Sequence, residues 1–277
     1  MSKKKVVVVI SARNEENFIS KTIDSLLAQD LPPELIVVVD DGSTDNTANI
    51  VRKYEKKGVV LIMREDRIGD PSLLGTPMMA IPFNIAFKYI ENSNTDFDYI
   101  MISGADCVYQ TNYIEKLTKR LDEKLKLVIV SGFQHGESLN RDHARGAGRI
   151  IKKSFWQIYG SKYPYPSYLW ESGIIFTAQM HGLQVRGYRD VFFTSQRISG
   201  TNINMIRYGR MLRAINYPFL IVMGRAVRII KKTGIKSAIN LLAGYCLNPI
   251  ESFEADTKIS EFISNYYLIQ KIRNFFL

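Results

Sequence analysis

Cysteine and histidine are scarce in this chain, and their scarcity excludes several kinds of site. The 277 residues include two cysteines, Cys107 and Cys246, and no Cys-x-x-Cys pair. Two isolated thiols form neither a disulfide framework nor a thiolate zinc site, and they favour a reducing, cytoplasmic location. The three histidines match no zinc-binding spacing either.

Long apolar runs are also missing. No stretch approaches the roughly 20 apolar residues that a membrane-spanning helix needs. At the N-terminus, Lys3–Lys5 precede the apolar run Val6–Ile10, an order that resembles a signal peptide. The run is short and leads into Ser11–Glu16 without a cleavage-like site, so we expect a buried strand there.

Acidic residues are outnumbered by basic ones. The chain has 37 Lys and Arg against 27 Asp and Glu, which gives a formal net charge of +10. Such a balance favours anionic partners, namely nucleotides, phospholipid head groups or nucleic acid. Because no RNA-binding signature or zinc-finger spacing accompanies the basic residues, nucleic acid is not an expected partner.

Apolar β-branched runs alternate with helical patterns over the first two-thirds of the chain. This β-α-β-α-β order predicts a mainly parallel sheet, and such sheets bind ligands at the carboxyl ends of their strands. We expect Pro82 to kink or delay a helix that begins near Thr76, and the basic segment 141–160 to be helical. The expected strands are 6–10, 35–39, 59–63, 99–103, 127–130 and 191–195. Other helices are expected from about Asn17, Ser43 and Tyr113, and at 174–180.

The pattern changes after about residue 216, where strand signals fade. We therefore expect an α/β domain over residues 1–215 and a helical extension over 216–277. One apolar stripe of helical spacing lies near the end of the extension: Ile259, Phe262, Ile263, Tyr266, Ile269, Ile272 and Phe276. The basic residues beside it are Lys258, Lys271 and Arg273. Such a stripe allows packing on the domain, dimerisation or contact with a membrane surface.

Two adjacent acids, Asp40 and Asp41, follow the expected strand 35–39 and precede Gly42 and Ser43. A helix cap and a tight turn explain Gly42 and Ser43, but not two neighbouring like charges, which repel. A carboxylate at a strand end can accept a hydrogen bond from the base or ribose of a nucleotide. We therefore interpret Asp41 as a nucleotide-binding residue.

Three segments resemble the inverting family 2 glycosyltransferases over about residues 6–200. They are Ser11-Ala12-Arg13-Asn14-Glu15, Asp40-Asp41-Gly42-Ser43 and the strand exit at Asp106. The resemblance implies the GT-A fold, a nucleotide-binding sandwich with a mainly parallel central sheet. It also implies that the first two strand exits hold the nucleotide, with Asp41 reaching the base. By position, the donor-binding residues would be Ser11, Asn14, Glu15 and Asp41.

An Asp-x-Asp motif follows in this family, and its last acid binds a divalent metal. Gly104 stands where the first acid usually lies, so the resemblance carries the metal role to Asp106 alone, with Ala105 beside it at the donor. Mg²⁺ or Mn²⁺ held by one carboxylate needs the donor's diphosphate as a further ligand. The alternative for Asp106 is an ordinary turn aspartate.

The family's catalytic base lies in a Glu-Asp pair about a dozen residues before a glycine. Counting back from Gly182 matches Trp170 and Glu171 to that pair, so both residue types differ from the family pattern. Glu171 is the expected base that deprotonates the acceptor hydroxyl. The alternative is a solvated acid near a helix N-terminus.

Two further positions resemble family features near the donor. Asn84, in Phe83-Asn84-Ile85-Ala86, resembles the asparagine of the family's Ala-x-Asn helix, with a capping or core-edge amide as the alternative. Arg197 falls where some members carry a basic phosphate-contacting motif, and a guanidinium binds phosphate bidentately. Further candidates for contact with the diphosphate are Arg64, Arg67 and Lys88.

The resulting hypothesis is a metal-assisted, inverting transfer of sugar from a UDP-, GDP- or dTDP-sugar to a sugar or lipid-linked acceptor. The expected location is the cytoplasm, with peripheral contact to the inner membrane face if the acceptor is a lipid. The altered Asp-x-Asp and Glu-Asp motifs favour one alternative, a non-catalytic nucleotide-sugar-binding protein of the same fold. A nucleotidyltransferase is the other, although Ser11–Asn17 lacks the glycine of the loop such enzymes carry.

Overall fold

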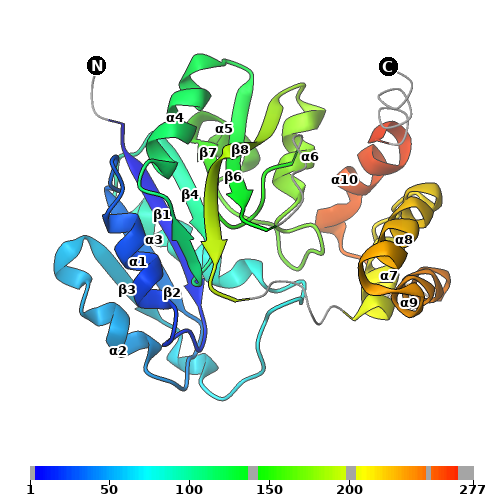
Figure 1. Cartoon of the computed structure of the whole chain (residues 1–277), viewed down its shortest axis with the longest axis horizontal. Coiled ribbons are helices and arrows are strands. Elements are labelled where there is room, and N and C mark those ends of the chain that lie inside the picture. Colours follow the sequence, from blue (N-terminus) through cyan, green and yellow to red (C-terminus); the bar gives the residue numbers. More distant parts are fainter. Residues whose placement is uncertain (1–3, 137–142, 198–203, 248–250, 268–277) are drawn as a thin grey trace. The chain divides into compact units, whose positions relative to one another are not determined.

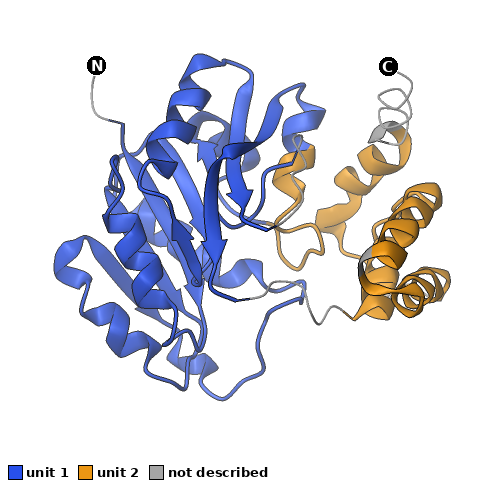
Figure 2. Ribbon diagram, viewed as in Figure 1, with its two compact units in different colours: residues 1–163, 177–198 blue, residues 164–176, 199–277 orange. Residues whose placement is uncertain are grey.

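The computed structural model describes residues 4–136, 143–197, 204–247 and 251–267, and the chain forms two compact units (Figure 2). Unit 1 comprises Met1–Tyr163 and Thr177–Ile198, and unit 2 comprises Pro164–Phe176 and Ser199–Leu277. Each unit has its own hydrophobic core.

Unit 1 contains an eight-stranded sheet with the strand order β3-β2-β1-β4-β7-β6-β8-β5 (Figure 1). Strands β1 to β4 are parallel to their neighbours among themselves, as the alternating pattern predicts. Beyond β4 the sheet is mixed. Strand β7 pairs antiparallel with β4 and β6, β5 pairs antiparallel with β8, and β6 and β8 are parallel to each other. The strands are β1 (Val6–Ala12), β2 (Leu35–Asp40), β3 (Val59–Met63), β4 (Tyr99–Ser103), β5 (Cys107–Tyr109), β6 (Leu127–Gln134), β7 (Arg149–Lys152) and β8 (Gln184–Ser195).

Helices cover both faces of this sheet. Residues of α1, α2 and α4 pack with Val6, Val8 and Ile10 of β1 in one core cluster, while α3 and α5 contact the strands from the other face. Alternate residues of a strand point to opposite faces, so the unbroken run of valines in β1 is buried on both. The helices are α1 (Ile19–Leu27), α2 (Thr47–Arg52), α3 (Ala80–Asn92), α4 (Tyr113–Glu123), α5 (Lys153–Tyr159) and α6 (Gly173–Met180). Short 3-10 turns occupy Glu55–Lys57 and Glu65–Arg67.

The structure resolves two expectations about helices, one for Pro82 and one for the segment 141–160. Pro82 lies in the first turn of α3, where its missing N–H leaves no helical hydrogen bond unmade, so it delays the helix and does not kink it. The segment 141–160 is not one helix, because Arg149–Lys152 forms β7 before α5 begins at Lys153. Arg149 is buried and its guanidinium donates to the carbonyl of Ala144, so a basic residue here belongs to the sheet interior.

The described residues of unit 2 are mainly helical, apart from the segment 164–172. Its helices α7 and α9 cross at two glycines: a Cβ on Gly209 would lie 2.1 Å from the carbonyl oxygen of Leu241, and a Cβ on Gly244 would lie 2.1 Å from that of Ile206. Only residues without a side chain allow backbones to approach this closely. The helices are α7 (Met205–Ala214), α8 (Phe219–Thr233), α9 (Ile235–Cys246) and α10 (Thr257–Phe262). A 3-10 turn, Glu254–Asp256, precedes α10, and a π-helical turn, Ile263–Tyr267, follows it.

The apolar stripe near the end of the chain packs inward where the structure describes it. Ile259 and Ile263 are buried in the core of unit 2, with 7 % and 0 % of their surface exposed. These two side chains are therefore not available to a membrane. Outside the described residues lie Ile269, Ile272, Phe276, Lys271 and Arg273. Among the helices that the structure describes, none is both long enough and apolar enough to span a bilayer.

Candidate functional site

Two strand exits are joined by hydrogen bonds at the carboxyl edge of the sheet. Asn14, which follows β1, has a positive φ of 53°, a conformation that asparagine tolerates better than most residues. Its side-chain oxygen accepts a hydrogen bond from the Thr44 N–H at 2.8 Å, and its own N–H donates to the Ser43 hydroxyl at 2.9 Å. The Glu15 N–H donates to the Thr47 hydroxyl at 2.7 Å. These hydrogen bonds hold the loops after β1 and β2 together.

The two adjacent acids after β2 have different surroundings. Asp40 turns back on its own loop, where its Oδ1 accepts from the Ser43 N–H at 2.7 Å. Asp41 points to Arg64, whose Nη1 lies 2.6 Å from its Oδ1, and to Arg67, whose Nε lies 3.7 Å away. The backbone carbonyl of Asp41 accepts a further hydrogen bond from the Arg13 guanidinium. Opposite charges thus resolve the repulsion between the two acids, and three arginines gather around one of them.

Gly42 makes the approach of these arginines possible. Its φ of +77° is in the left-handed region, and a Cβ there would lie 2.5 Å from the backbone carbonyl carbon and oxygen of Arg67. The loop that carries Arg64 and Arg67 thus rests directly on the Gly42 backbone. Glycine at this position has a steric reason as well as a conformational one.

Asp106 lies at the exit of β4, beside the end of β8. Its Oδ2 accepts a hydrogen bond from the Ser195 hydroxyl at 2.7 Å, and its backbone carbonyl accepts from the Gln196 N–H at 2.8 Å. Ala105 is buried, and its carbonyl accepts from the Thr22 hydroxyl of α1 at 2.8 Å. The exit of β4 is therefore fixed from two sides.

Arg197 links three separate segments of the chain. Its Nη2 lies 2.5 Å from Glu15 Oε1, and its Nε lies 3.3 Å from Asp106 Oδ2. The guanidinium also stands over the Phe18 ring at 5.1 Å. We refer to Glu15, Asp106 and Arg197 as the acid-arginine cluster. It joins the exits of β1, β4 and β8, which sequence spacing alone does not bring together.

Burial disfavours the charged form of Glu15, one of the two acids of this cluster. The Glu15 carboxyl is only 9 % exposed, and its Oε2 has no hydrogen-bond partner. Burial raises the pKa of Glu15 above its ordinary value, and the ion pair with Arg197 offsets only part of the rise. Asp106 keeps one lightly used oxygen, Oδ1, whose contact is the Cys107 thiol at 3.7 Å. Both acids thus retain acceptor capacity for a further cation or donor.

Gly104, which replaces the first acid of the expected Asp-x-Asp motif, has little space for a side chain. A Cβ there would lie 2.9 Å from Cys107 Sγ and 3.1 Å from Asp106 Oδ1. Cys107 is itself buried, and burial together with the charge of Asp106 raises its pKa to about 12. The thiol therefore stays protonated and occupies the space into which a residue at 104 would extend.

Two other predicted donor-binding residues, Ser11 and Asn84, lie outside the acid-arginine cluster. Ser11 pairs with Val39 in the ladder between β1 and β2 and is partly exposed at the carboxyl end of β1. Asn84 lies in α3, and its amide exchanges two hydrogen bonds of 2.8 Å with the backbone of Tyr163. Both ends of the Asn84 amide are therefore occupied, and its role at the donor stays a prediction.

Glu171 belongs to unit 2, whereas the acid-arginine cluster belongs to unit 1. It lies in the turn before α6, next to Ser172, whose carbonyl accepts from the N–H groups of Ile175 and Phe176. Its position near a helix N-terminus matches the alternative raised from the sequence and is compatible with a base role as well.

Sequence reasoning did not single out Arg13 or Ser195 as members of the site. Arg13 stands inside the quoted Ser11–Glu15 segment, and its guanidinium donates to the carbonyls of Asp41 and Asp70. Ser195 is the last residue of β8 and binds Asp106. A basic residue at a strand exit was the available signal for Arg13, whereas Ser195 had none.

The described residues hold no ready-made metal cage, because no three acid, histidine or cysteine side chains in these ranges come together. The donor set of the acid-arginine cluster fits a different kind of site. Mg²⁺ and Mn²⁺ accept one or two protein carboxylates when substrate phosphates complete the coordination. Asp106, with its spare Oδ1, and Glu15, with its orphaned Oε2, supply such oxygens.

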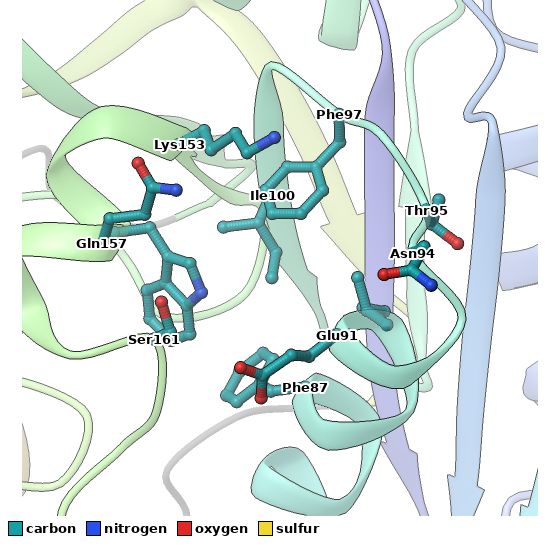
Figure 3. Close-up of a pocket in the computed structure, with 11 residues that line it drawn as sticks. Phe87, Glu91, Asn94, Thr95, Phe97, Ile100, Lys153, Gln157 and Ser161 are labelled. Atoms are coloured by element: carbon teal, nitrogen blue, oxygen red, sulfur yellow. The ribbon is translucent and has the colours of Figure 1, made fainter.

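A cavity of about 210 Å³ lies elsewhere in unit 1, between α3 and α5 (Figure 3). Its lining includes Phe97, just before β4, Ile100, near the start of β4, and Lys153, just after β7, so it lies at the amino end of β4. The acid-arginine cluster lies at the carboxyl end of the same strand. Ligands bind parallel sheets at the carboxyl end, so this cavity is not the candidate site.

The comparison with solved structures concerns the fold. The chain superposes on the mannosyltransferase PcManGT from Pyrobaculum calidifontis in complex with GDP-Man and Mn²⁺, with a TM-score of 0.59, 16 % identity, and coverage of 98 % of this chain and 84 % of that one. It also superposes on residues 1–349 of TarS from S. aureus in complex with UDP-GlcNAc, with a TM-score of 0.56, 19 % identity, and coverage of 87 % and 71 %. The expected α/β fold of the GT-A type is confirmed.

The sequence comparisons concern the first quarter of the chain. Residues 7–69 match the model of glycosyl transferase family 2. A poly(ribitol-phosphate) beta-glucosyltransferase from Bacillus spizizenii is 42 % identical over 71 residues, which cover 24 % of this chain and 11 % of that protein. The matched segment contains the first two strand exits, and the expected resemblance to family 2 glycosyl transferases is confirmed for it. The alignment spans only about a tenth of that relative.

Proposed function

We propose that this protein transfers a sugar from a nucleoside diphosphate sugar to a hydroxyl or phosphate acceptor in glycan or glycolipid synthesis. One observation carries the proposal: the acid-arginine cluster and the arginine-bound Asp41 lie at the carboxyl ends of the neighbouring parallel strands β1, β2 and β4. This carboxyl edge is where such sheets bind nucleotides. A poly(ribitol-phosphate) beta-glucosyltransferase and the structures with UDP-GlcNAc and GDP-Man support the same class of reaction.

Charge distribution assigns the roles within the donor site. Asp41 has its Oδ1 on Arg64, which leaves the other carboxylate oxygen to accept from the base. Arg13 and Arg67, at the same edge, supply guanidinium groups for the diphosphate. On this proposal Ser11, Asn14 and Glu15 contact the donor from the carboxyl end of β1, and Ala105 and Asp106 contact it from the exit of β4.

A divalent cation, Mg²⁺ or Mn²⁺, completes the proposal. When bound, it supplies a Lewis acid that stabilises the charge developing on the departing diphosphate. Asp106 would hold it, through the carboxylate oxygen that Cys107 only weakly contacts. Arg197, now on Asp106 and Glu15, is free to turn one face of its guanidinium to phosphate, because its side chain is 48 % exposed.

The first test is a calorimetric titration of the full chain with UDP, GDP and dTDP, each with and without Mn²⁺. We expect one nucleotide to bind, and Mn²⁺ to raise its affinity by about tenfold or more, about 1.4 kcal/mol. If one nucleotide binds with the same affinity with and without Mn²⁺, the metal role of Asp106 is wrong, and the proposed donor site stands. If none of the three binds under either condition, the proposed donor site is wrong.

We further propose that Glu171 is the general base, which makes the reaction inverting. Replacing Glu171 by glutamine removes the proton acceptor, so transfer should fall by about 10²–10⁴-fold while nucleotide affinity stays unchanged. Glu171→Asp should retain part of the activity, because it keeps the carboxylate. Glu261→Gln, an exposed position of α10, is the matched control and should transfer normally. Equal rates for Glu171→Gln and Glu261→Gln would exclude Glu171 as the base.

A further inference from the structure

The outer face of α8 presents large apolar side chains to solvent. Five residues of this helix are exposed by 45 to 65 %: Phe219, Leu220, Met223, Val227 and Ile230. At 3.6 residues per turn they fall within an arc of about 100° on the helix surface. We call these five residues the α8 strip. Scattered exposed apolar residues are normal, but a continuous strip on one helix marks an interaction surface.

The orientation of α8 is fixed from its other side. Val222 and Ala226 are 0 % and 4 % exposed and pack in the core of unit 2. Arg225, on the same inner side, is bound to the hydroxyl groups of Tyr208 and Tyr217. The helix therefore cannot rotate to bury the α8 strip without exposing its own core residues.

Basic residues lie on one flank of the strip, and acidic residues are absent from this part of the sequence. Residues 204–247 contain eight lysines and arginines and no aspartate or glutamate. Arg228 and Lys231 are exposed, and at 3.6 residues per turn Lys231 falls about 20° and Arg228 about 80° beyond Leu220 around the helix axis. Both have long aliphatic stems that can lie on an apolar surface while the charge stays in water.

We propose that the α8 strip inserts into the interface of an anionic lipid bilayer. An interfacial helix needs an apolar face, flanking lysine and arginine residues, and too little length and hydrophobicity to span. The α8 helix meets each requirement, and none of the described helices spans. A second copy of this chain is a poorer occupant, because it would bring a second set of the exposed cations Arg228 and Lys231 near the first, with no acidic residue in 204–247 to pair with them.

The proposal concerns a different surface from the stripe near the end of the chain, whose described members Ile259 and Ile263 are buried. It is also independent of sugar transfer, because vesicle binding is measured without a donor. Failure of one proposal therefore leaves the other standing.

Flotation of the full chain with lipid vesicles tests the strip. We compare Leu220→Glu, in the strip, with Leu125→Glu, a leucine of unit 1 that is 93 % exposed. The wild-type chain and Leu125→Glu should float with vesicles of phosphatidylglycerol mixed into phosphatidylcholine. Leu220→Glu should bind them at least about tenfold more weakly. The substitution replaces a leucine side chain that the bilayer would bury with a charged one. An unchanged affinity for Leu220→Glu, or no flotation of the wild type, overturns the proposal.

The double variant Arg228→Gln/Lys231→Gln tests the charge. Each cation near an anionic surface contributes about fivefold in affinity, so binding to the mixed vesicles should fall by about twentyfold. Sedimentation of the same variants provides the remaining outcome. If the wild-type chain is a dimer that Leu220→Glu dissociates, and neither floats, the strip is a contact between copies and the bilayer proposal is wrong.

Discussion

Replacing Asp106 by asparagine is expected to abolish sugar transfer while leaving unit 1 folded. Asparagine keeps the shape of the side chain and can still accept from the Ser195 hydroxyl, which lies 2.7 Å from Oδ2. It removes the negative charge that faces Arg197 and that we assign to the metal. Loss of several kcal/mol of charge stabilisation lowers the rate by about a thousandfold or more.

Two measurements on this variant separate a chemical effect from a structural one. The first is the rate at which nucleoside diphosphate is released from the donor, and the second is the Mn²⁺ dependence of nucleotide binding. Asp106→Asn should lose both the rate and the effect of Mn²⁺. Asp190→Asn is the control, since Asp190 lies in β8, is 62 % exposed and pairs with Arg120. Full activity in Asp106→Asn would end the metal assignment.

Replacing Gly42 by alanine is expected to destabilise the chain and to weaken nucleotide binding together. The left-handed backbone costs a residue with a Cβ about 1–2 kcal/mol. The new Cβ would also lie 2.5 Å from the backbone of Arg67, and such overpacking costs about 1–3 kcal/mol more. The backbone cannot rotate away like a side chain, so the loop that carries Arg64 and Arg67 must move off Asp41.

Gly58 provides a matched control for this substitution, because its backbone conformation is nearly the same. Its φ of +78° nearly equals the +77° of Gly42, but the nearest atom to a Cβ there is 3.8 Å away. Gly58→Ala therefore carries the backbone strain without the clash. Chemical denaturation should place Gly42→Ala below Gly58→Ala by about 1–3 kcal/mol, and only Gly42→Ala should bind nucleotide more weakly. Equal stability and equal affinity of the two variants would refute the steric role of Gly42.

The first half of the sheet could be predicted because its determinants are local. The run Val6–Ile10 and its counterpart at 35–39 are apolar throughout, which is typical of strands buried on both faces. Gly58 in the left-handed conformation ends the turn before β3, as its place after a helical pattern predicts. Asp41 attracted attention for a local reason too, since two adjacent acids at a strand end need a partner; that partner is Arg64, while the nucleotide-binding role of Asp41 stays a prediction.

The remaining parts depend on contacts that sequence patterns do not contain. Arg197 and Glu15 are 182 positions apart, and only the folded sheet brings them within hydrogen-bonding distance. The short strands β5 and β7 escaped notice because three or four residues have no recognisable period, and Arg149 in β7 resembles a surface residue until Ala144 accepts its hydrogen bond. The close crossing of α7 and α9 is likewise invisible in isolated glycines such as Gly209.

Unit 2 draws on two stretches of chain, and this decides how the protein can be divided in the laboratory. The Asp256 carboxylate accepts from the Ser167 hydroxyl and from the N–H groups of Tyr168 and Leu169. A fragment that ends at residue 215 would keep these three donors and lose their acceptor, as well as the helices against which Leu169 packs. C-terminal truncation would therefore damage the segment 164–176, which contains Glu171, and a fragment that keeps both stretches intact preserves it.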